Sequence, residues 1–378
     1  SLGFLRMGTT ALAARSRDNQ QLQETLFHGL WTTLPLTLVL MTVGFGLLPQ
    51  LLGLIDMKPE LAAETLNYLS IRLFSIPAVL VQYVLLGWFI GQGLTRVPLI
   101  MMVSANLANA GLDYLFVYGL DMTADGVALG SLMADYFSVF VGLWILRRHA
   151  ISLLDIRHNR PDGKAMKSLV KVNGDLFVRT LLLLSVIAFF NAMGASQGEL
   201  VLATNAVMMT LLMLISNALD GFAHAAESLL GKSLVQRQFE QSRRVIVLTG
   251  VNSLALALGL LAGFALFSDT VFQLLTNNSA LLPLLNDYLV FLILLPLVGF
   301  GSYWLDGICL AAGASDQMRN AMIFSVFLVF LPVWWATLIW GNSGLWLAFY
   351  GFLIARVLFV LPLLWRLFRQ PDSYVPSD

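Results

Sequence analysis

Charged side chains and cysteine are scarce in this chain. Of its 378 residues only 12% are Asp, Glu, Lys or Arg, whereas 58% are hydrophobic. So little polar surface cannot cover a water-soluble protein of this size, which excludes an ordinary soluble domain. The single cysteine, Cys309, lies in an apolar stretch and excludes a disulfide framework or a cysteine-rich metal site. No GxxxxGK[ST] phosphate-binding loop occurs, which argues against an ATP-hydrolysing site.

Long apolar runs account for most of the chain. They recur between short polar breaks, and each has roughly the 18 to 25 residues that a helix needs to cross a bilayer. No alternating apolar and polar pattern competes, which disfavours a membrane β-barrel. We therefore predict an all-α integral membrane protein. Ten complete spans are expected at about residues 25–48, 64–92, 98–120, 126–146, 174–194, 198–231, 243–267, 284–312, 320–340 and 344–365.

The chain contains an internal duplication. Residues 83–93 (YVLLGWFIGQG) and 303–313 (YWLDGICLAAG) share a tyrosine and two glycines at the same places, 220 residues apart. The match continues upstream, where Pro77 corresponds to Pro296 at an offset of 219. A duplicated hydrophobic chain is typical of alternating-access transporters, whose substrate path lies between the two halves.

The duplication also predicts the domain organisation. The residues before Arg15 are too few to cross a membrane, and their repeat partner is the end of the helix that finishes near Gly231. We therefore expect twelve spans in the intact protein, six in each lobe, with the first helix and half of the second missing from this N-terminally truncated sequence. The expected parts are an incomplete N-terminal lobe (1–150), a cytoplasmic linker (151–172), partly amphipathic, and a C-terminal lobe (173–378).

Basic residues concentrate in a subset of the loops. Such loops face the cytoplasm in membrane proteins, and counting spans from them places the C-terminus on the cytoplasmic side. Nucleic-acid binding is the weaker explanation, because positive loops are expected here in any case. The residues concerned are Arg147, Arg148, Arg157, Arg160, Lys164, Lys167 and Lys171 between the halves, and Lys232, Arg237, Arg243 and Arg244 in the second half.

The two halves differ in polar residues, and the duplication acts as an internal control. A polar residue that the architecture demands should occur in both halves, whereas an unrepeated one needs another reason. Asn109 and Asp113 lie four residues apart on one helix face, and Ser131 lies on the next helix. The second half has only apolar residues at the corresponding places, which are Phe327 to Val329, Leu331 to Val333, and Phe349.

This trio predicts a coupling-ion or protonation site. A carboxylate within an apolar span is costly unless it is paired, hydrated or protonated, and by default it suggests an ion or proton pathway. An apolar environment generally raises the pKa of a carboxyl group, so that both protonation states are accessible near neutral pH. Asn109 and Ser131 can supply neutral hydrogen bonds to Asp113 in either state. The alternative is that Asp113 caps its helix or pairs with a loop near the outer end of the span.

The second half carries a polar set of its own. Asp220, His224 and Glu227 share one helix face, and Asp306 lies within the repeated segment. These residues could line a hydrated cavity that binds a cation or relays protons, or they could form a packed network between helices. Their spacing matches no recognisable metal site, so we expect no metal. Further charges within spans, Arg6, Arg72 and Arg356, are expected to pair with these acids or to reach the membrane interface.

Five stretches of the chain resemble a known transporter family. The chain resembles the multidrug and toxic compound extrusion (MATE) family, in particular its DNA-damage-inducible protein F (DinF) branch, over essentially its whole length. The stretches that carry the resemblance are FLRMGTTALAARS, NAGLDYLFVYG, NGDLFVRTLLL, NAVMMTLLMLISNALDGFAHAAES and LPLVGFGSYWLDG.

The resemblance implies a secondary antiporter that exchanges H⁺ or Na⁺ for lipophilic, often cationic compounds by alternating access of two lobes. It implies multidrug efflux across a bacterial inner membrane by a monomer, with no cofactor besides the coupling ion. The family's first-lobe site combines an Asp on helix 1, in the missing segment, with residues that match Asn109, Asp113 and Ser131. Some relatives use a second-lobe carboxylate pair, which Glu227 and Asp306 resemble more loosely.

The sequence leaves several alternatives open. Asn173, Asp175 and Arg179 could form an inner gate or the polar cap of the helix after the linker, and the cap is the preferred interpretation. Within transport, a lipid-linked precursor flippase shares the architecture, although the candidate cavity residues here are mainly acidic. The alternative outside transport is an intramembrane enzyme, but no span shows a recognisable nucleophile with its base.

Overall fold

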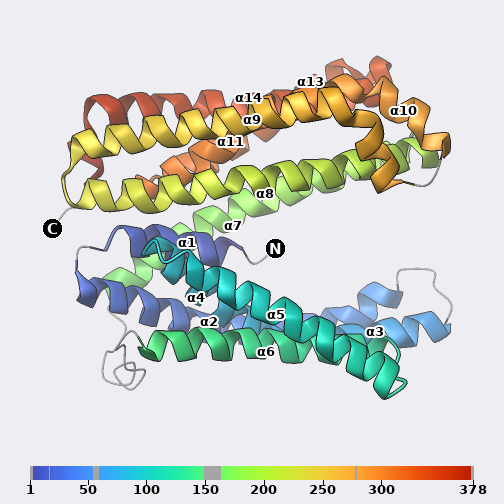
Figure 1. Cartoon of the computed structure of the whole chain (residues 1–378), viewed down its shortest axis with the longest axis horizontal. Helices are drawn as coiled ribbons and strands as arrows, with labels where there is room; N and C mark the ends of the chain where they lie inside the picture. The colour runs from blue at the N-terminus through green and yellow to red at the C-terminus, as the bar shows by residue number, and fades with distance from the viewer. Residues whose placement is uncertain (1–2, 17, 54–58, 149–162, 277–278, 376–378) are drawn as a thin grey trace. The chain divides into compact units, whose positions relative to one another are not determined.

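The described part of the chain is mostly helical. The computed structural model describes residues 3–16, 18–53, 59–148, 163–276 and 279–375, and within these ranges no residue lies in a β-strand. The chain forms two compact units, residues 1–171 and 172–378 (Figure 1). The prediction of an all-α membrane protein is confirmed.

The first unit contains six α-helices and one π-helical segment among its described residues. They are α1 (Phe4–Ala14), α2 (Asn19–Gly53), α3 (Pro59–Leu73), α4 (Ile76–Gly91), α5 (Arg96–Tyr114), the π-helical η1 (Leu115–Gly119) and α6 (Ala124–Arg148).

The next helix, α7 (Gly163–Ala195), crosses the boundary between the units, and the other helices belong to the second unit. They are α8 (Glu199–Val235), α9 (Phe239–Leu275), α10 (Leu282–Asp287), α11 (Leu289–Ala311), α12 (Ser315–Phe324), the π-helical η4 (Ser325–Phe330), α13 (Leu331–Ala336) and α14 (Gly341–Arg369). Short 3₁₀ segments occur at η3 (Ser279–Leu281), η5 (Leu338–Trp340) and η6 (Pro371–Tyr374).

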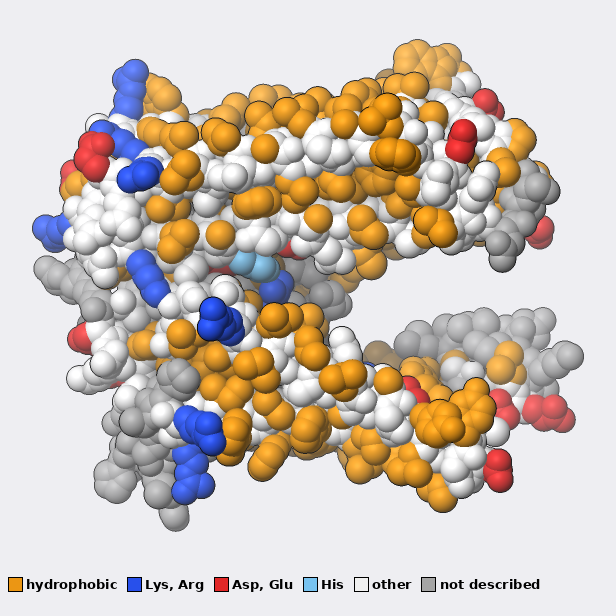
Figure 2. Space-filling model, viewed as in Figure 1, with side chains coloured by type: hydrophobic (Ala, Val, Ile, Leu, Met, Phe, Trp, Pro, Cys, Tyr) orange, Lys and Arg blue, Asp and Glu red, His pale blue; other side chains and the backbone are white. Residues whose placement is uncertain are grey.

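The helices have the length and surface of membrane spans. Nine of the described helical stretches are long and apolar enough to cross a bilayer, and a bent pair, α3 with α4, makes a tenth. Figure 2 shows hydrophobic side chains along the sides of the helices, with Lys and Arg toward one end of each unit. Large apolar residues such as Leu274 and Ile339 are exposed, which suits contact with lipid.

One expected span is broken rather than continuous. The stretch predicted at 64–92 consists of α3 and α4, which meet at an angle of 45° between Leu73 and Ile76. Pro77 explains the break, because proline has no N–H and cannot donate to the Leu73 carbonyl four residues earlier. Residues 151–162 of the expected linker (151–172) lie outside the described residues, and its remaining residues belong to α7, which begins at Gly163.

The repeated glycines have the same structural task in both units. A Cβ atom at Gly87 in α4 would collide with the backbone carbonyl of Arg6 in α1. A Cβ atom at Gly307 in α11 would collide in the same way with the carbonyl of Ala223 in α8. Each glycine therefore lets two helices approach closely, and the duplicated sequence corresponds to duplicated packing.

The second pair of repeated glycines ends the helices. Gly93 and Gly313 have φ values of 77° and 70°, in the left-handed region that favours glycine. In each turn the N–H of the next residue donates back into the preceding helix, from Leu94 to Phe89 at 3.0 Å and from Ala314 to Cys309 at 2.9 Å. Both turns are therefore the same helix-ending motif.

Candidate functional site

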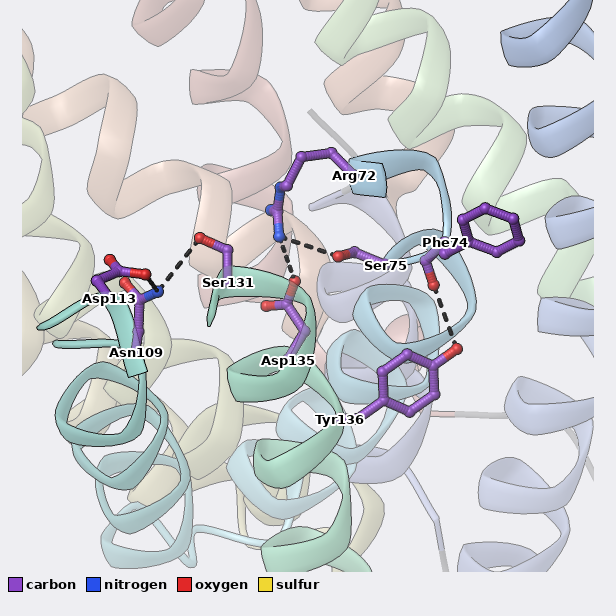
Figure 3. A network of polar contacts seen from close by, with 8 residues as sticks. All are labelled: Arg72, Phe74, Ser75, Asn109, Asp113, Ser131, Asp135 and Tyr136. Atoms are coloured by element: carbon purple, nitrogen blue, oxygen red, sulfur yellow. Dashed lines mark hydrogen bonds and ion pairs between the residues drawn. The ribbon is translucent and has the colours of Figure 1, made fainter. Parts of the chain in front are cut away.

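The first-unit trio lies together in space. Asn109 and Asp113 are one turn apart on α5, and Ser131 lies on α6, which packs against α5 (Figure 3). The Nδ2 group of Asn109 donates to Asp113 Oδ1 and to Ser131 Oγ, at 3.2 Å in both cases. All three side chains are half-buried. One amide group therefore connects the carboxylate to the hydroxyl across two helices.

Gly130 is a fourth member that the sequence interpretation did not single out. A Cβ atom built on Gly130 would collide with Asp113 Oδ1 and would lie 3.3 Å from the backbone nitrogen of Asp113. The Asp113 carboxylate therefore packs directly on the backbone of α6, where only glycine leaves room. At the offset of 218 that relates Ser131 to Phe349, the second half has Ala348. The absence of glycine at the corresponding position of the second half is the sequence signal that could have identified Gly130.

An ion pair lies one turn along α6 from Ser131. Arg72, at the end of α3, contacts Asp135 Oδ2 through Nη1 at 2.9 Å (Figure 3). We expected Arg72 to pair with one of the candidate acids or to reach the membrane interface. It pairs instead with Asp135, an acid that the sequence interpretation had passed over.

The second-unit acids are held by different partners. Asp220, His224 and Glu227 all lie on α8, and His224 Nδ1 lies 3.5 Å from Oε2 of the fully buried Glu227. Asp306, on α11, is paired with Arg356 Nη2 at 2.6 Å and also with Arg179 Nη2. The expected pairing of Arg356 with one of these acids is confirmed.

The contacts of Asp306 join three helices. Arg179 comes from α7 and Arg356 from α14, and the side chains of both arginines are less than 10% exposed. Two guanidinium groups next to one carboxylate compensate its charge, so this carboxylate is a poor place for another cation. This geometry is that of a buried ion-pair cluster between helices rather than that of an open cation site.

The expected polar cap on α7 is wrong. The helix begins at Gly163, so Asn173, Asp175 and Arg179 lie several turns inside it. Asp175 Oδ2 accepts a hydrogen bond from Ser315 at 2.8 Å, and its Oδ1 pairs with Arg319 Nη1 at 2.5 Å. Asp175 thus connects α7 to α12, as Arg179 connects α7 to α11. The sequence showed the polar residues, but not that the helix starts well before them.

Among the described residues, no group of three or more His, Cys, Asp or Glu side chains is placed to hold a metal ion. The Asp113 carboxylate can accept a proton, and the oxygen atoms of Asp113, Asn109 and Ser131 are of the kind that coordinate hard cations.

The sequence is similar to a family model and to known proteins over most of its length. The sequence model of the MatE family matches residues 2–115 and 176–335. The chain is 32% identical to DNA damage-inducible protein F of Escherichia coli K12, over 96% of this chain and 80% of that protein. It is also 25% identical to the chloroplastic Protein DETOXIFICATION 44 of Arabidopsis thaliana, over 80% of this chain and 57% of that protein.

Solved structures show the same fold at low sequence identity. A crystal structure of MATE in the bent conformation matches with a TM-score of 0.86 at 21% identity, over 99% of this chain and 85% of that one. A variant of the Vibrio cholerae MATE transporter VcmN matches with a TM-score of 0.85 at 20% identity, over 99% of this chain and 86% of that one.

Proposed function

The chain belongs to the MatE family of multidrug efflux transporters, and on this premise we propose that it is an antiporter that exchanges H⁺ or Na⁺ for lipophilic, often cationic compounds. It is a multi-pass membrane transporter rather than an enzyme, as its relatives are transporters. In the proposal its two units are the lobes of an alternating-access cycle, and energy comes from the ion gradient.

The observation that carries the proposal is the hydrogen-bonded trio of Asn109, Asp113 and Ser131. In the arrangement seen, Asn109 donates to the Asp113 carboxylate, which stabilises its ionised form. A bound proton or Na⁺ would cancel the charge, and the Ser131 hydroxyl can rotate to donate or accept. In the proposed cycle, Asp113 is the coupling-ion or protonation site, and Asn109 and Ser131 tune it.

The second-unit acids have a different role in this proposal. Asp306 is engaged by two arginines, and Glu227 lies beside His224 within a packed helix interface. We assign Asp306 to holding α7, α11 and α14 together, and we assign the coupling role to neither Asp306 nor the α8 residues Asp220, His224 and Glu227. Replacing Glu227 and Asp306 by their amides tests this assignment, because ion coupling should persist in whatever fraction of the variant protein folds.

Orientation and substrate are part of the same proposal. Arg147 and Arg148 end α6, and Arg366 and Arg369 end α14, so by the positive-inside rule these helix ends are cytoplasmic. The protein would then be a monomer in the bacterial inner membrane with a cytoplasmic C-terminus. Its partners would be lipids and small drug-like molecules, with no cofactor besides the coupling ion.

The experiment that tests the proposal compares Asp113→Asn with Asp121→Asn in vesicles. Asp121 is an exposed acid shortly after the same helix, with a φ of 52° that asparagine tolerates well. Ion-driven efflux of a fluorescent dye should be lost in Asp113→Asn and retained in Asp121→Asn. Unchanged efflux in Asp113→Asn would remove Asp113 from the mechanism.

A further inference from the structure

The bend in the broken span of the first unit is held by side chains from α6. Arg72 Nη1 donates to Asp135 Oδ2 and to Ser75 Oγ, both at 2.9 Å, and Ser75 is only 2% exposed. Tyr136 Oη donates to the backbone carbonyl of Phe74 at 3.2 Å (Figure 3). Because the bend interrupts the helical ladder there, this hydroxyl gives a freed carbonyl a partner.

The same face of α6 makes polar contacts with three other helices. Ser131, Asp135 and Ser138 follow at i, i+4 and i+7, so they form one stripe along the helix. Ser131 receives the Asn109 hydrogen bond from α5, and Asp135 holds α3. Ser138 accepts from Gln82 of α4 at 2.9 Å. The Ser131 hydroxyl is therefore on the same face of α6 as Asp135, which pairs with Arg72 at the bend.

The ion pair is not something that the duplicated architecture requires. At the offset of 219 that relates Pro77 to Pro296, Arg72 corresponds to Phe291. At the offset of 218 that relates Ser131 to Phe349, Asp135 corresponds to Leu353. Both members of the pair are thus absent from the second half, as is the trio itself. Because Arg72 and Asp135 occur only in the half that carries the trio, we connect their role with the trio.

We infer that Arg72, Asp135 and Tyr136 are positioning residues for the ion site. They fix the bent span against α6 and so keep Ser131 within hydrogen-bond reach of Asn109. The inference rests on the proposed function, because the trio is the site being positioned. The helices that pack against α6 carry few charges, and of these Arg72 contacts Asp135. The charged residues are Glu60, Glu64 and Arg72 on α3 and Arg96 and Asp113 on α5, whereas α4 has none between 76 and 91.

The first test measures the geometry without transport. Spin labels on Leu61 of α3 and Phe140 of α6, which are 53% and 64% exposed, report the distance between these helices in the purified protein. Cys309 is fully buried, so it does not compete for the label. Asp135→Asn and Arg72→Gln should broaden the distance distribution about twofold, because a local restraint is lost. Exchanging the two charges, Arg72→Asp with Asp135→Arg, should narrow it again.

A matched control exists on the same two helices. Asn67 Nδ2 of α3 contacts Asp125 Oδ2 of α6 at 3.4 Å, in an exposed position away from the bend. Asn67→Ala removes this other polar link between α3 and α6, and we expect it to leave the distance distribution unchanged. An equal broadening in Asn67→Ala and Asp135→Asn would overturn the specific role of the bend contacts.

The second test connects the bend to the ion site. In Asp135→Asn, the pH at which efflux is half-maximal should differ from the wild-type value by about one unit, which is a tenfold change in proton concentration. In the exchanged-charge variant this pH should return to the wild-type value. Tyr136→Phe should move it in the same direction by less. An unchanged midpoint together with a broadened distance would overturn the positioning role. Failure of the proposed function has a different signature, which is normal efflux by Asp113→Asn.

Discussion

Gly130→Ala should damage the ion site while leaving the fold largely intact. The added methyl group would collide with Asp113 Oδ1 and would lie 3.3 Å from both the Cγ and the backbone nitrogen of Asp113. To relieve the collision, Asp113 Oδ1 must leave its present position, in which it accepts the hydrogen bond from Asn109. The substitution therefore disturbs Asp113 without changing any polar atom of the trio.

The size of the effect follows from opposing contributions. Overpacking of this kind costs about 1–3 kcal/mol. Replacing a helical glycine by alanine returns about 1 kcal/mol, so the net loss of stability should be about 0–2 kcal/mol. The hydrogen bond from Asn109 contributes about 0.5–1.5 kcal/mol to the stability of the site. The upper value corresponds to a factor of about ten in an equilibrium constant. Coupled efflux should therefore fall by about that factor in protein that is still folded.

The assay is dye efflux from vesicles driven by a pH gradient, with thermal unfolding of the same preparations. Gly111→Ala is the matched control, because Gly111 lies on the same helix as Asp113 and its Cβ would meet nothing within 4 Å. This control should keep normal efflux and gain a little stability. Wild-type efflux and pH dependence in Gly130→Ala would refute the idea that the carboxylate must rest on the α6 backbone.

Two further predictions concern the packing of the second unit. Gly307→Ala should destabilise the protein by about 1–3 kcal/mol, since the new Cβ meets the backbone carbonyl of Ala223. Gly259→Ala has open space and, like Gly111→Ala, should gain a little stability, so thermal unfolding distinguishes the two variants. Asp306→Asn should cost about 3–5 kcal/mol, because it leaves two buried guanidinium groups without their carboxylate. As a control, Glu240→Gln at an exposed position weakens the pair with Arg243 and should change the melting temperature little. A stable Asp306→Asn variant with altered ion coupling would contradict the structural role assigned to Asp306.

The membrane architecture was predictable from the sequence because its causes are local or repeated. Apolar runs of sufficient length give the spans, and glycines at matching places give matching helix contacts and helix ends. The trio could also be predicted, because Asn109 and Asp113 are four residues apart and Ser131 stands out by its missing counterpart. These inferences used neighbours along one helix or the comparison of two halves.

The contacts that were missed join residues far apart in the sequence. Arg179 reaches Asp306 across 127 positions, and Arg72 reaches Asp135 across 63. Periodicity shows which face of a helix a residue occupies, but it does not show which other helix lies opposite. For that reason the sequence left open whether Asp306 lines a hydrated cavity or belongs to a packed network, whereas the structure places it between two arginines.

The central claim is that one carboxylate, Asp113, couples ion entry to export. The most direct measurement is dye efflux by wild type and Asp113→Asn in vesicles, with a proton gradient in one arm and a sodium gradient in the other. We predict that wild type responds to at least one gradient and that Asp113→Asn responds to neither, while Asp121→Asn behaves as wild type. Gradient-driven efflux at the wild-type rate in Asp113→Asn would contradict the account.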